Sequence, residues 1–198
     1  MTQQVITYCL GIPEVYRKQA VALYDQAFGQ KLSVAIGKSA DREPLFIKGL
    51  QLEYAIGAIS ENQLVGLAGF QTADGSLTNG IQYSDLLAQL GLFKSLWALI
   101  IFSLYHREPR TSELVMDGIV VDANARGLGI GSALLKQVQQ LAQDKGYQTV
   151  RLDVIDINPR AQKLYERMGF KSIKTESYPY LKGLLGFSGS TTMQFIIS

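Results

Sequence analysis

The second half of the chain alternates strand and helix patterns, and this order leaves few folds open to it. Glu113–Val121 and Thr149–Ile155 have the apolar, β-branched composition of strands, whereas 127–145 repeats apolar residues at helical spacing. The segment 158–168 is a second helical pattern, and 170–178 is the next predicted strand. Strands that alternate with helices are typical of crossover connections. We therefore predict an α/β sheet.

The first half carries weaker patterns, and no internal repeat or low-complexity linker divides it from the second half. One domain over residues 1–198 is expected, since single domains commonly hold about 100–200 residues. The other predicted elements are strands at 5–10, 53–60, 63–71 and 191–197, helices at 13–28 and 83–105, and an exposed turn at 72–80. Gly29 marks the end of the first helix. The helix at 83–105 is predicted as one element despite Gly91.

The composition argues against several classes of protein. Nineteen basic and 17 acidic residues leave a net charge of +2, which gives no support for nucleic-acid binding. One cysteine and one histidine cannot form an internal disulfide or a Cys/His zinc site, so we expect no metal. The N-terminus lacks the pattern of a signal peptide, and the uncharged run 95–105 is shorter than a membrane span of about 20 residues. We expect a cytoplasmic protein without membrane contact.

Three glycines in five residues lie between a predicted strand and a predicted helix, in the run RGLGIG at 126–131. Glycine permits unusual dihedrals and lets a ligand approach the backbone closely. The first turn of a helix has N–H groups without intrahelical partners, which together with the helix dipole bind anions such as a pyrophosphate. Arg126 adds a permanent positive charge. The spacing fits neither a Walker loop nor a dinucleotide fingerprint. A tight strand–helix turn without a ligand is the other interpretation.

This run resembles the acyl-CoA signature of the GNAT acetyltransferases, Arg/Gln-x-x-Gly-x-Gly/Ala. Arg126, Gly129 and Gly131 match its three fixed positions. Roughly 30 residues later, the family pattern N-x-x-A-x-x-L-Y-x-x-x-G-F is matched by Asn158, Ala161, Leu164, Tyr165, Gly169 and Phe170. The resemblance covers 113–170 closely. It implies the GNAT fold, a mixed central sheet with splayed central strands flanked by helices, in which the apolar helix near 83–105 is an insertion.

The resemblance also implies a cofactor and the residues that hold it. Acetyl-CoA is the expected acyl donor, with its pantetheine arm in the gap between the splayed strands. Backbone groups of Ile119, Val120 and Val121 would pair with that arm, and Asn158 would bond to it. The pyrophosphate would lie against a cradle formed by Arg126, Gly127, Leu128, Gly129, Ile130, Gly131 and Ser132.

Three side chains are candidates for proton transfer. The resemblance implies that Tyr165 protonates the leaving thiolate, although its helical spacing also suits a simple apolar face. Strand alternation puts five residues on one face of the strand: Glu113, Val115, Asp117, Ile119 and Val121. We favour Asp117 as the base that accepts the amine proton, directly or through water, because partial burial raises the pKa of a carboxylate. Glu113 is the second candidate.

The predicted function is transfer of an acyl group, most simply acetyl, from acyl-CoA to a small-molecule amine or a peptide by direct attack on the thioester. A non-catalytic acyl-CoA sensor and an interaction module are the alternatives. The helix at 83–105 is apolar nearly all round, so it could wall the acceptor pocket, form a homodimer contact or belong to the core. The late aromatic residues Tyr178, Tyr180 and Phe187 could wall the acceptor pocket or pack within a hairpin loop.

Overall fold

The computed structural model describes residues 5–105 and 110–197. Its centre is an eight-stranded sheet with the order β1-β2-β3-β5-β6-β8-β7, in which the short β4 pairs with β3. Strands β5 and β6 are parallel, and the other neighbours are antiparallel. The strands are β1 Thr7–Leu10, β2 Ala55–Ser60, β3 Gln63–Thr72, β4 Gly75–Ser76, β5 Glu113–Val121, β6 Thr149–Ile155, β7 Lys171–Ser177 and β8 Gly189–Ile196. This mixed sheet confirms the predicted α/β class.

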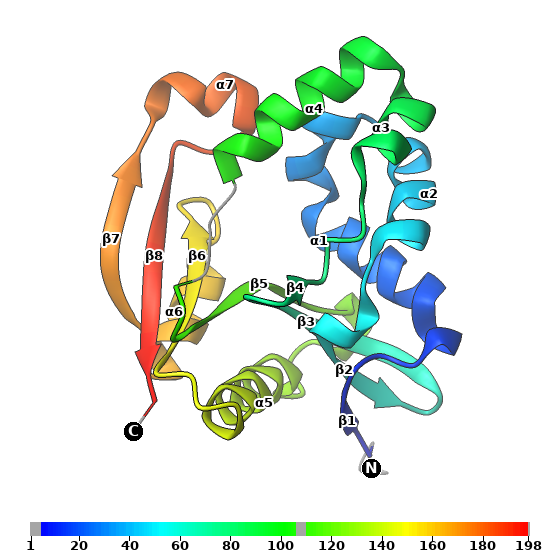
Figure 1. Ribbon diagram of the computed structural model, residues 1–198. Coiled ribbons are helices and arrows are strands. Elements are labelled where there is room, and N and C mark those ends of the chain that lie inside the picture. Colours follow the sequence, from blue (N-terminus) through cyan, green and yellow to red (C-terminus); the bar gives the residue numbers. More distant parts are fainter. Residues whose placement is uncertain (1–4, 106–109, 198) are drawn as a thin grey trace.

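Helices cover both faces of the sheet (Figure 1). One face carries α5 (Ile130–Asp144) and α6 (Pro159–Arg167), and the other carries α1 (Arg17–Ile36), α2 (Ser39–Gly49), α3 (Tyr83–Leu90) and α4 (Leu92–Tyr105). The shorter helices are η1 Glu14–Tyr16, η2 Leu52–Tyr54, η3 Ala123–Ala125, η4 Pro179–Leu181 and α7 Lys182–Leu185. Within 5–105 and 110–197, no helix has the length and apolar character needed to cross a membrane.

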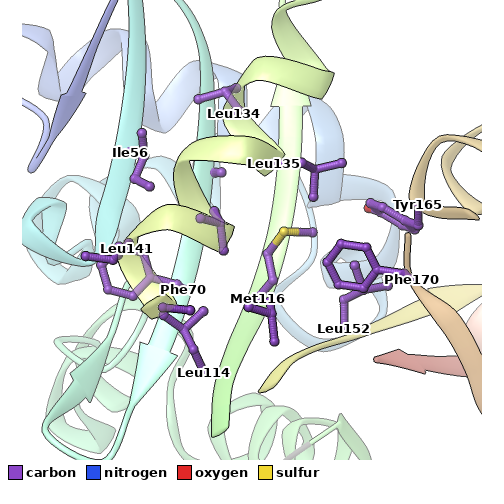
Figure 2. Close-up of a cluster of buried hydrophobic side chains, with 14 of the residues drawn as sticks. Ile56, Phe70, Leu114, Met116, Leu134, Leu135, Leu141, Leu152, Tyr165 and Phe170 are labelled. Atoms are coloured by element: carbon purple, nitrogen blue, oxygen red, sulfur yellow. The ribbon is translucent and has the colours of Figure 1, made fainter. Parts of the chain in front are cut away.

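The larger core lies between the sheet and α5 (Figure 2). Leu134, Leu135 and Val138 fall on one helical face and are fully buried. They pack into the same cluster as Met116 of β5 and Phe170. Burial of each large aliphatic side chain contributes about 1.5–3 kcal/mol. This packing fixes α5 against β5, so the first turn of the helix is held just beyond the end of the strand.

Three sequence predictions about the first half are wrong. Helix α1 continues past Gly29 to Ile36; a Cβ at Gly29 would lie 2.7 Å from Nη2 of Arg42, so the glycine makes room for a guanidinium rather than ending the helix. The helix at 83–105 is two helices, because Gly91 has a φ of 75° and caps α3. Residues 75–77 are buried, not exposed, and the first two form β4, which pairs with β3.

Helix α4 packs mainly onto α1 and α3. Ala98 and Ile101 are buried in a small cluster with Ala35 and Ile36, and Nε1 of Trp97 donates a hydrogen bond to the Val34 carbonyl at 2.9 Å. This places part of α4 in the core. Among the described side chains of α4, the exposed apolar ones are Leu92, Phe93, Leu96, Trp97 and Leu99, and Lys94 is exposed as well.

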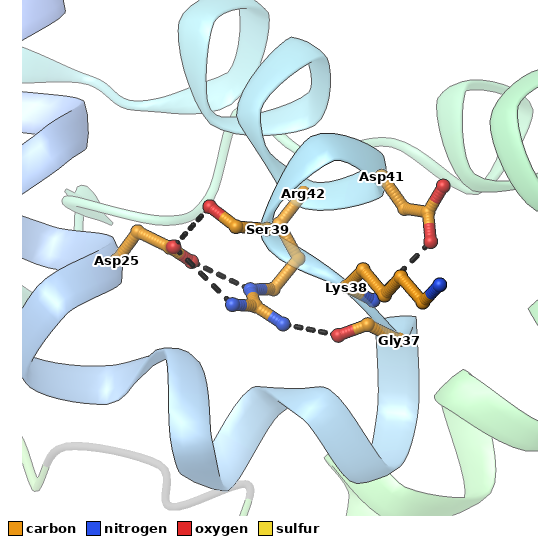
Figure 3. A network of polar contacts seen from close by, with 6 residues as sticks. All are labelled: Asp25, Gly37, Lys38, Ser39, Asp41 and Arg42. Atoms are coloured by element: carbon orange, nitrogen blue, oxygen red, sulfur yellow. Dashed lines mark hydrogen bonds and ion pairs between the residues drawn. The ribbon is translucent and has the colours of Figure 1, made fainter.

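A buried ion pair joins α1 to α2 (Figure 3). Nε of Arg42 lies 2.5 Å from Oδ1 of Asp25, and the two side chains are 7% and 16% exposed. Ser39 Oγ donates to Asp25 at 2.5 Å, and Arg42 Nη1 also donates to the Gly37 carbonyl. Burial raises the pKa of Asp25, but the hydrogen bonds from Arg42 and Ser39 outweigh it and hold the pKa below its ordinary value.

Loss of this ion pair should destabilise the fold at neutral pH. We expect Arg42→Met to lower the free energy of unfolding by about 3 kcal/mol, because it leaves the Asp25 carboxylate buried without its charge partner. Since the pKa of Asp25 is depressed in the folded chain, this stabilisation is present above about pH 4 and is lost as the pH falls further. Urea denaturation at pH 7 and pH 3 checks the prediction; an equal loss at both pH values would contradict it.

Candidate active site

The two central strands pair only at their beginnings. Strands β5 and β6 are in register at three positions, which end with Val115 opposite Arg151, yet β5 continues to Val121 and β6 to Ile155. A bulge at Asp117 begins where this pairing stops, since Phe70 of β3 pairs with Met116 and Gly69 pairs with Gly118. An extra residue in a strand bends it and increases its local twist. The last six residues of β5 are therefore unpaired on the β6 side, as expected for splayed strands.

A cleft of about 640 Å³ opens between the separated strand ends. It is lined by every residue predicted to hold the pantetheine arm, which are Ile119, Val120, Val121 and Asn158, and also by Arg126. Its other walls come from α1, with Gln26, Ala27 and Phe28, and from the α7 region, with Gly183, Gly186 and Phe187. The cleft thus lies between the unpaired backbone of β5, helix α1 and the α7 region.

The glycine run forms a second hollow of about 230 Å³ that shares Val121 and Arg126 with the cleft. Gly127 and Gly129 have φ values of 86° and 76°, and a Cβ at either would meet nothing within 4 Å. Helix α5 begins at Ile130, not at residue 127 as predicted, so the first turn of the helix, residues 130–132, lines this hollow. The N–H groups of a first turn suit an anion.

Six of the seven residues predicted to form the cradle line this hollow, which are Arg126, Gly127, Gly129, Ile130, Gly131 and Ser132. Leu128 is the exception, because its side chain is 53% exposed and does not line the hollow. A diphosphate with an attached linear arm fits the residues present, since the hollow supplies backbone N–H groups and the adjoining cleft supplies an unpaired strand edge.

Asn158 caps α6, as its position before Pro159 predicts. Its Oδ1 accepts a hydrogen bond from the Ala161 N–H at 3.2 Å, which leaves the side-chain NH₂ as a donor beside the cleft. Tyr165, two turns further on, is 6% exposed and lies against Phe170 with ring centroids 6.0 Å apart. Burial raises the pKa of Tyr165 to about 12. The phenol is therefore protonated at neutral pH, as a proton donor must be.

Asp117 is the most perturbed carboxylate in the described chain. Burial raises its pKa to about 6, against a smaller lowering by the backbone N–H of Leu77, which donates to it. Its Oδ2 is buried and has no hydrogen-bond partner among the described residues. Tyr24 lies close by, and burial together with the charge of Asp117 raises the pKa of that phenol. A carboxylate with a free oxygen and a pKa near neutrality can accept a proton from an amine.

Glu113, the second candidate base, is already paired. Its Oε2 lies 2.7 Å from Nη1 of Arg151, and the two side chains are 4% and 13% exposed. The prediction that Glu113 shares one face with Ile119 and Val121 is wrong. The bulge at Asp117 shifts the alternation, so Ile119 and Val121 pack against the α5 core.

The sequence predictions missed the contribution of α1. Phe28 lines the cleft and lies so close to β5 that a Cβ at Gly118 would come within 2.2 Å of its ring. Because the helix was predicted to end at residue 28, the contact of Phe28 with the cleft and β5 was not recognised from the sequence. Of the late aromatic residues, Phe187 is buried against Tyr178 and lines the cleft, whereas Tyr180 is 81% exposed.

Comparisons with known proteins point to one family. The model of the acetyltransferase (GNAT) family matches residues 30–170. A thialysine N-epsilon-acetyltransferase from Bos taurus is 40% identical over 60 residues, which are 30% of this chain and 35% of that protein. An N-acetylaspartate synthetase from Rattus norvegicus is 33% identical over 85 residues, 43% of this chain and 28% of that protein. The chain thus matches about a third of the length of these curated relatives.

Solved structures share the fold over nearly the whole chain. An N-acetyltransferase from Staphylococcus aureus Mu50 superposes with a TM-score of 0.65 and 17% identity over 98% of this chain and 99% of that one. The ribosomal-protein-S18-alanine N-acetyltransferase from Escherichia coli gives 0.56 and 16% over 98% and 95%. At these identities the likeness is one of fold.

Proposed function

Because the chain belongs to the GNAT acetyltransferase family, we propose that it transfers an acyl group, most simply acetyl, from acyl-CoA to an amine. One observation carries this proposal. An anion hollow at the start of α5 opens into a cleft between splayed strands, and the strand that forms one wall also carries Asp117, a carboxylate with a raised pKa. A chain that only bound acyl-CoA would have no need of such a base.

The proposed mechanism assigns one task to each group. Acyl-CoA supplies a thioester carbonyl as the electrophile. Backbone N–H groups at the start of α5 and Arg126 hold the diphosphate, while the unpaired edge of β5 and the NH₂ of Asn158 orient the arm. Asp117 accepts the proton that the amine loses as its nitrogen forms the new C–N bond. Tyr165 donates its proton to the sulfur as the C–S bond breaks, and solvent restores the phenol.

We further propose that the acceptor is a small molecule, since the names of two relatives specify thialysine and acetylaspartate as their small-molecule substrate and product. A cytoplasmic location remains our proposal, because a chain with one cysteine does not depend on an oxidising compartment. Release of free thiol from acetyl-CoA in the presence of a panel of amines tests the activity. Amine-dependent release supports it, and binding of acetyl-CoA without release for any amine would favour the sensor.

A pair of glycine variants tests the cradle. Gly129→Val places a branched side chain in the hollow, so we expect CoA affinity to fall at least about tenfold, or roughly 1.4 kcal/mol. Gly146→Val is the matched control: Gly146, beyond the other end of α5, has a φ of 75° and an equally open Cβ position. Both variants incur the same backbone strain, but only the first should lose CoA binding by calorimetry. Equal affinities would refute the assignment.

A further inference from the structure

Two buried polar side-chain atoms have no hydrogen-bond partner within the part of the chain that the structure describes. They are Oδ2 of Asp117 and Nη2 of Arg151. Burying a polar group without a partner is unfavourable, and more so for a charged group. Native proteins retain few such atoms, and a bound ligand is one reason to keep them. Oδ2 of Asp117 is a hydrogen-bond acceptor, whereas Nη2 of Arg151 is a donor on a cationic group.

Both side chains project from the same face of the sheet on adjacent strands. Val150, Leu152 and Val154 of β6 pack into the α5 core, so Arg151 points to the opposite face. Arg151 stands opposite Val115, the last register pair before the strands separate, and Asp117 lies two residues further along β5. Both residues therefore lie where the pairing of β5 with β6 ends.

The pairing of Arg151 with Glu113 leaves Nη2 of the guanidinium without a hydrogen-bond partner among the described residues. Only Nη1 contacts the carboxylate, at 2.7 Å, although a guanidinium commonly grips a carboxylate with two parallel bonds. This contact uses Nη1 and leaves Nη2 to donate elsewhere. A guanidinium N–H is a suitable donor to a carboxylate oxygen.

We propose that Nη2 of Arg151 binds a carboxylate of the acceptor while Asp117 faces its amine, so the preferred acceptors are amino acids or related amines that carry a carboxylate. This inference rests on the proposed function, because it takes Asp117 as the base. Glu113 already offsets the charge of Arg151, so the selection comes from a directed hydrogen bond. We therefore expect a preference of about tenfold or more, in the range of one bond to a charged group.

The test compares acceptors that differ only in the carboxylate, with acetyl-CoA as donor: lysine with cadaverine, phenylalanine with phenethylamine, and leucine with 3-methylbutylamine. The wild-type chain should show a kcat/KM at least about tenfold higher for the preferred amino acid than for its decarboxylated partner. A chain that acetylates amines without regard to the carboxylate would overturn this inference alone. A chain that acetylates no amine would overturn the proposed function as well.

A double variant tests whether Arg151 causes the preference for acceptors that carry a carboxylate. Arg151→Met with Glu113→Gln removes both charges, so neither is left buried alone. The ratio of kcat/KM for the amino acid to that for its decarboxylated partner should then fall to nearly one, through a higher KM for the amino acid. The single variant Glu113→Gln keeps the guanidinium and should keep the preference. Unchanged CoA affinity in both variants shows that the site is folded. A double variant with the full wild-type preference would refute the role of Arg151.

Discussion

Replacement of Asp117 with asparagine should lower turnover by about 10²- to 10³-fold, within the usual range for a general base. The side chain keeps its shape but can no longer accept a proton from the attacking amine. For the wild-type chain, kcat/KM should rise with pH through about 6, where Asp117 loses its proton. The variant should lack that step. Initial rates from pH 5 to pH 8 at saturating acetyl-CoA measure both effects.

The same substitution should make the folded chain more stable. A rise in the pKa of Asp117 from 3.8 to about 6 corresponds to about 3 kcal/mol that the ionised carboxylate costs the folded state. Because the folded-state pKa is the higher one, this cost is absent below about pH 4, grows up to pH 6 and is complete above it. The neutral amide of the variant avoids the cost at every pH. We therefore expect Asp117→Asn to unfold at higher urea concentration than wild type at pH 8, with little difference at pH 4.

Asp153→Asn is the matched control for Asp117→Asn. Asp153 is an exposed carboxylate on β6 that accepts a hydrogen bond from Thr192, so its replacement should change neither the pH profile nor the stability difference. An Asp117→Asn variant that turned over at the wild-type rate would end the assignment of the base. Loss of activity together with lower stability at pH 8 would instead mean that the carboxylate has a structural role.

The elements around the cradle could be predicted from the sequence because local signals agree there. Asn158 and Pro159 fix the start of α6, and the apolar spacing of α5 places its buried face. The bulge at Asp117 could not be predicted, because it depends on how β5 pairs with β3. Strict alternation of side chains along β5 therefore predicts the correct face of the sheet for Asp117 and the wrong face for Ile119.

Glycines mislead a prediction from sequence in both directions. Gly29 resembles a helix end, yet it lies within α1, where its missing side chain admits the guanidinium of Arg42. Gly91 lies inside a continuous helical pattern, yet its positive φ ends α3. The difference between the two depends on tertiary neighbours, which a single sequence does not show. The same holds for the Glu113–Arg151 pair, whose members are 38 residues apart.

Removal of the Tyr165 hydroxyl should separate a catalytic tyrosine from a core tyrosine. Tyr165→Phe keeps the ring that packs against Phe170, so we expect the free energy of unfolding and CoA affinity to stay close to wild type. If the phenol protonates the leaving thiolate, turnover should fall by about 10²-fold or more. Its hydroxyl makes no hydrogen bond within the described residues, so no structural bond is lost with it.

Tyr147→Phe is the control for Tyr165→Phe, because Tyr147 packs against the same core just after α5 but lies outside α6. It should leave turnover unchanged. Full turnover in Tyr165→Phe would mean that Tyr165 only packs on the apolar face of α6 and that solvent protonates the leaving thiolate. The leaving thiolate provides a further check, since a leaving group that needs no proton removes the demand for an acid. With such an acyl donor, the activities of Tyr165→Phe and wild type should converge if Tyr165 acts as the acid.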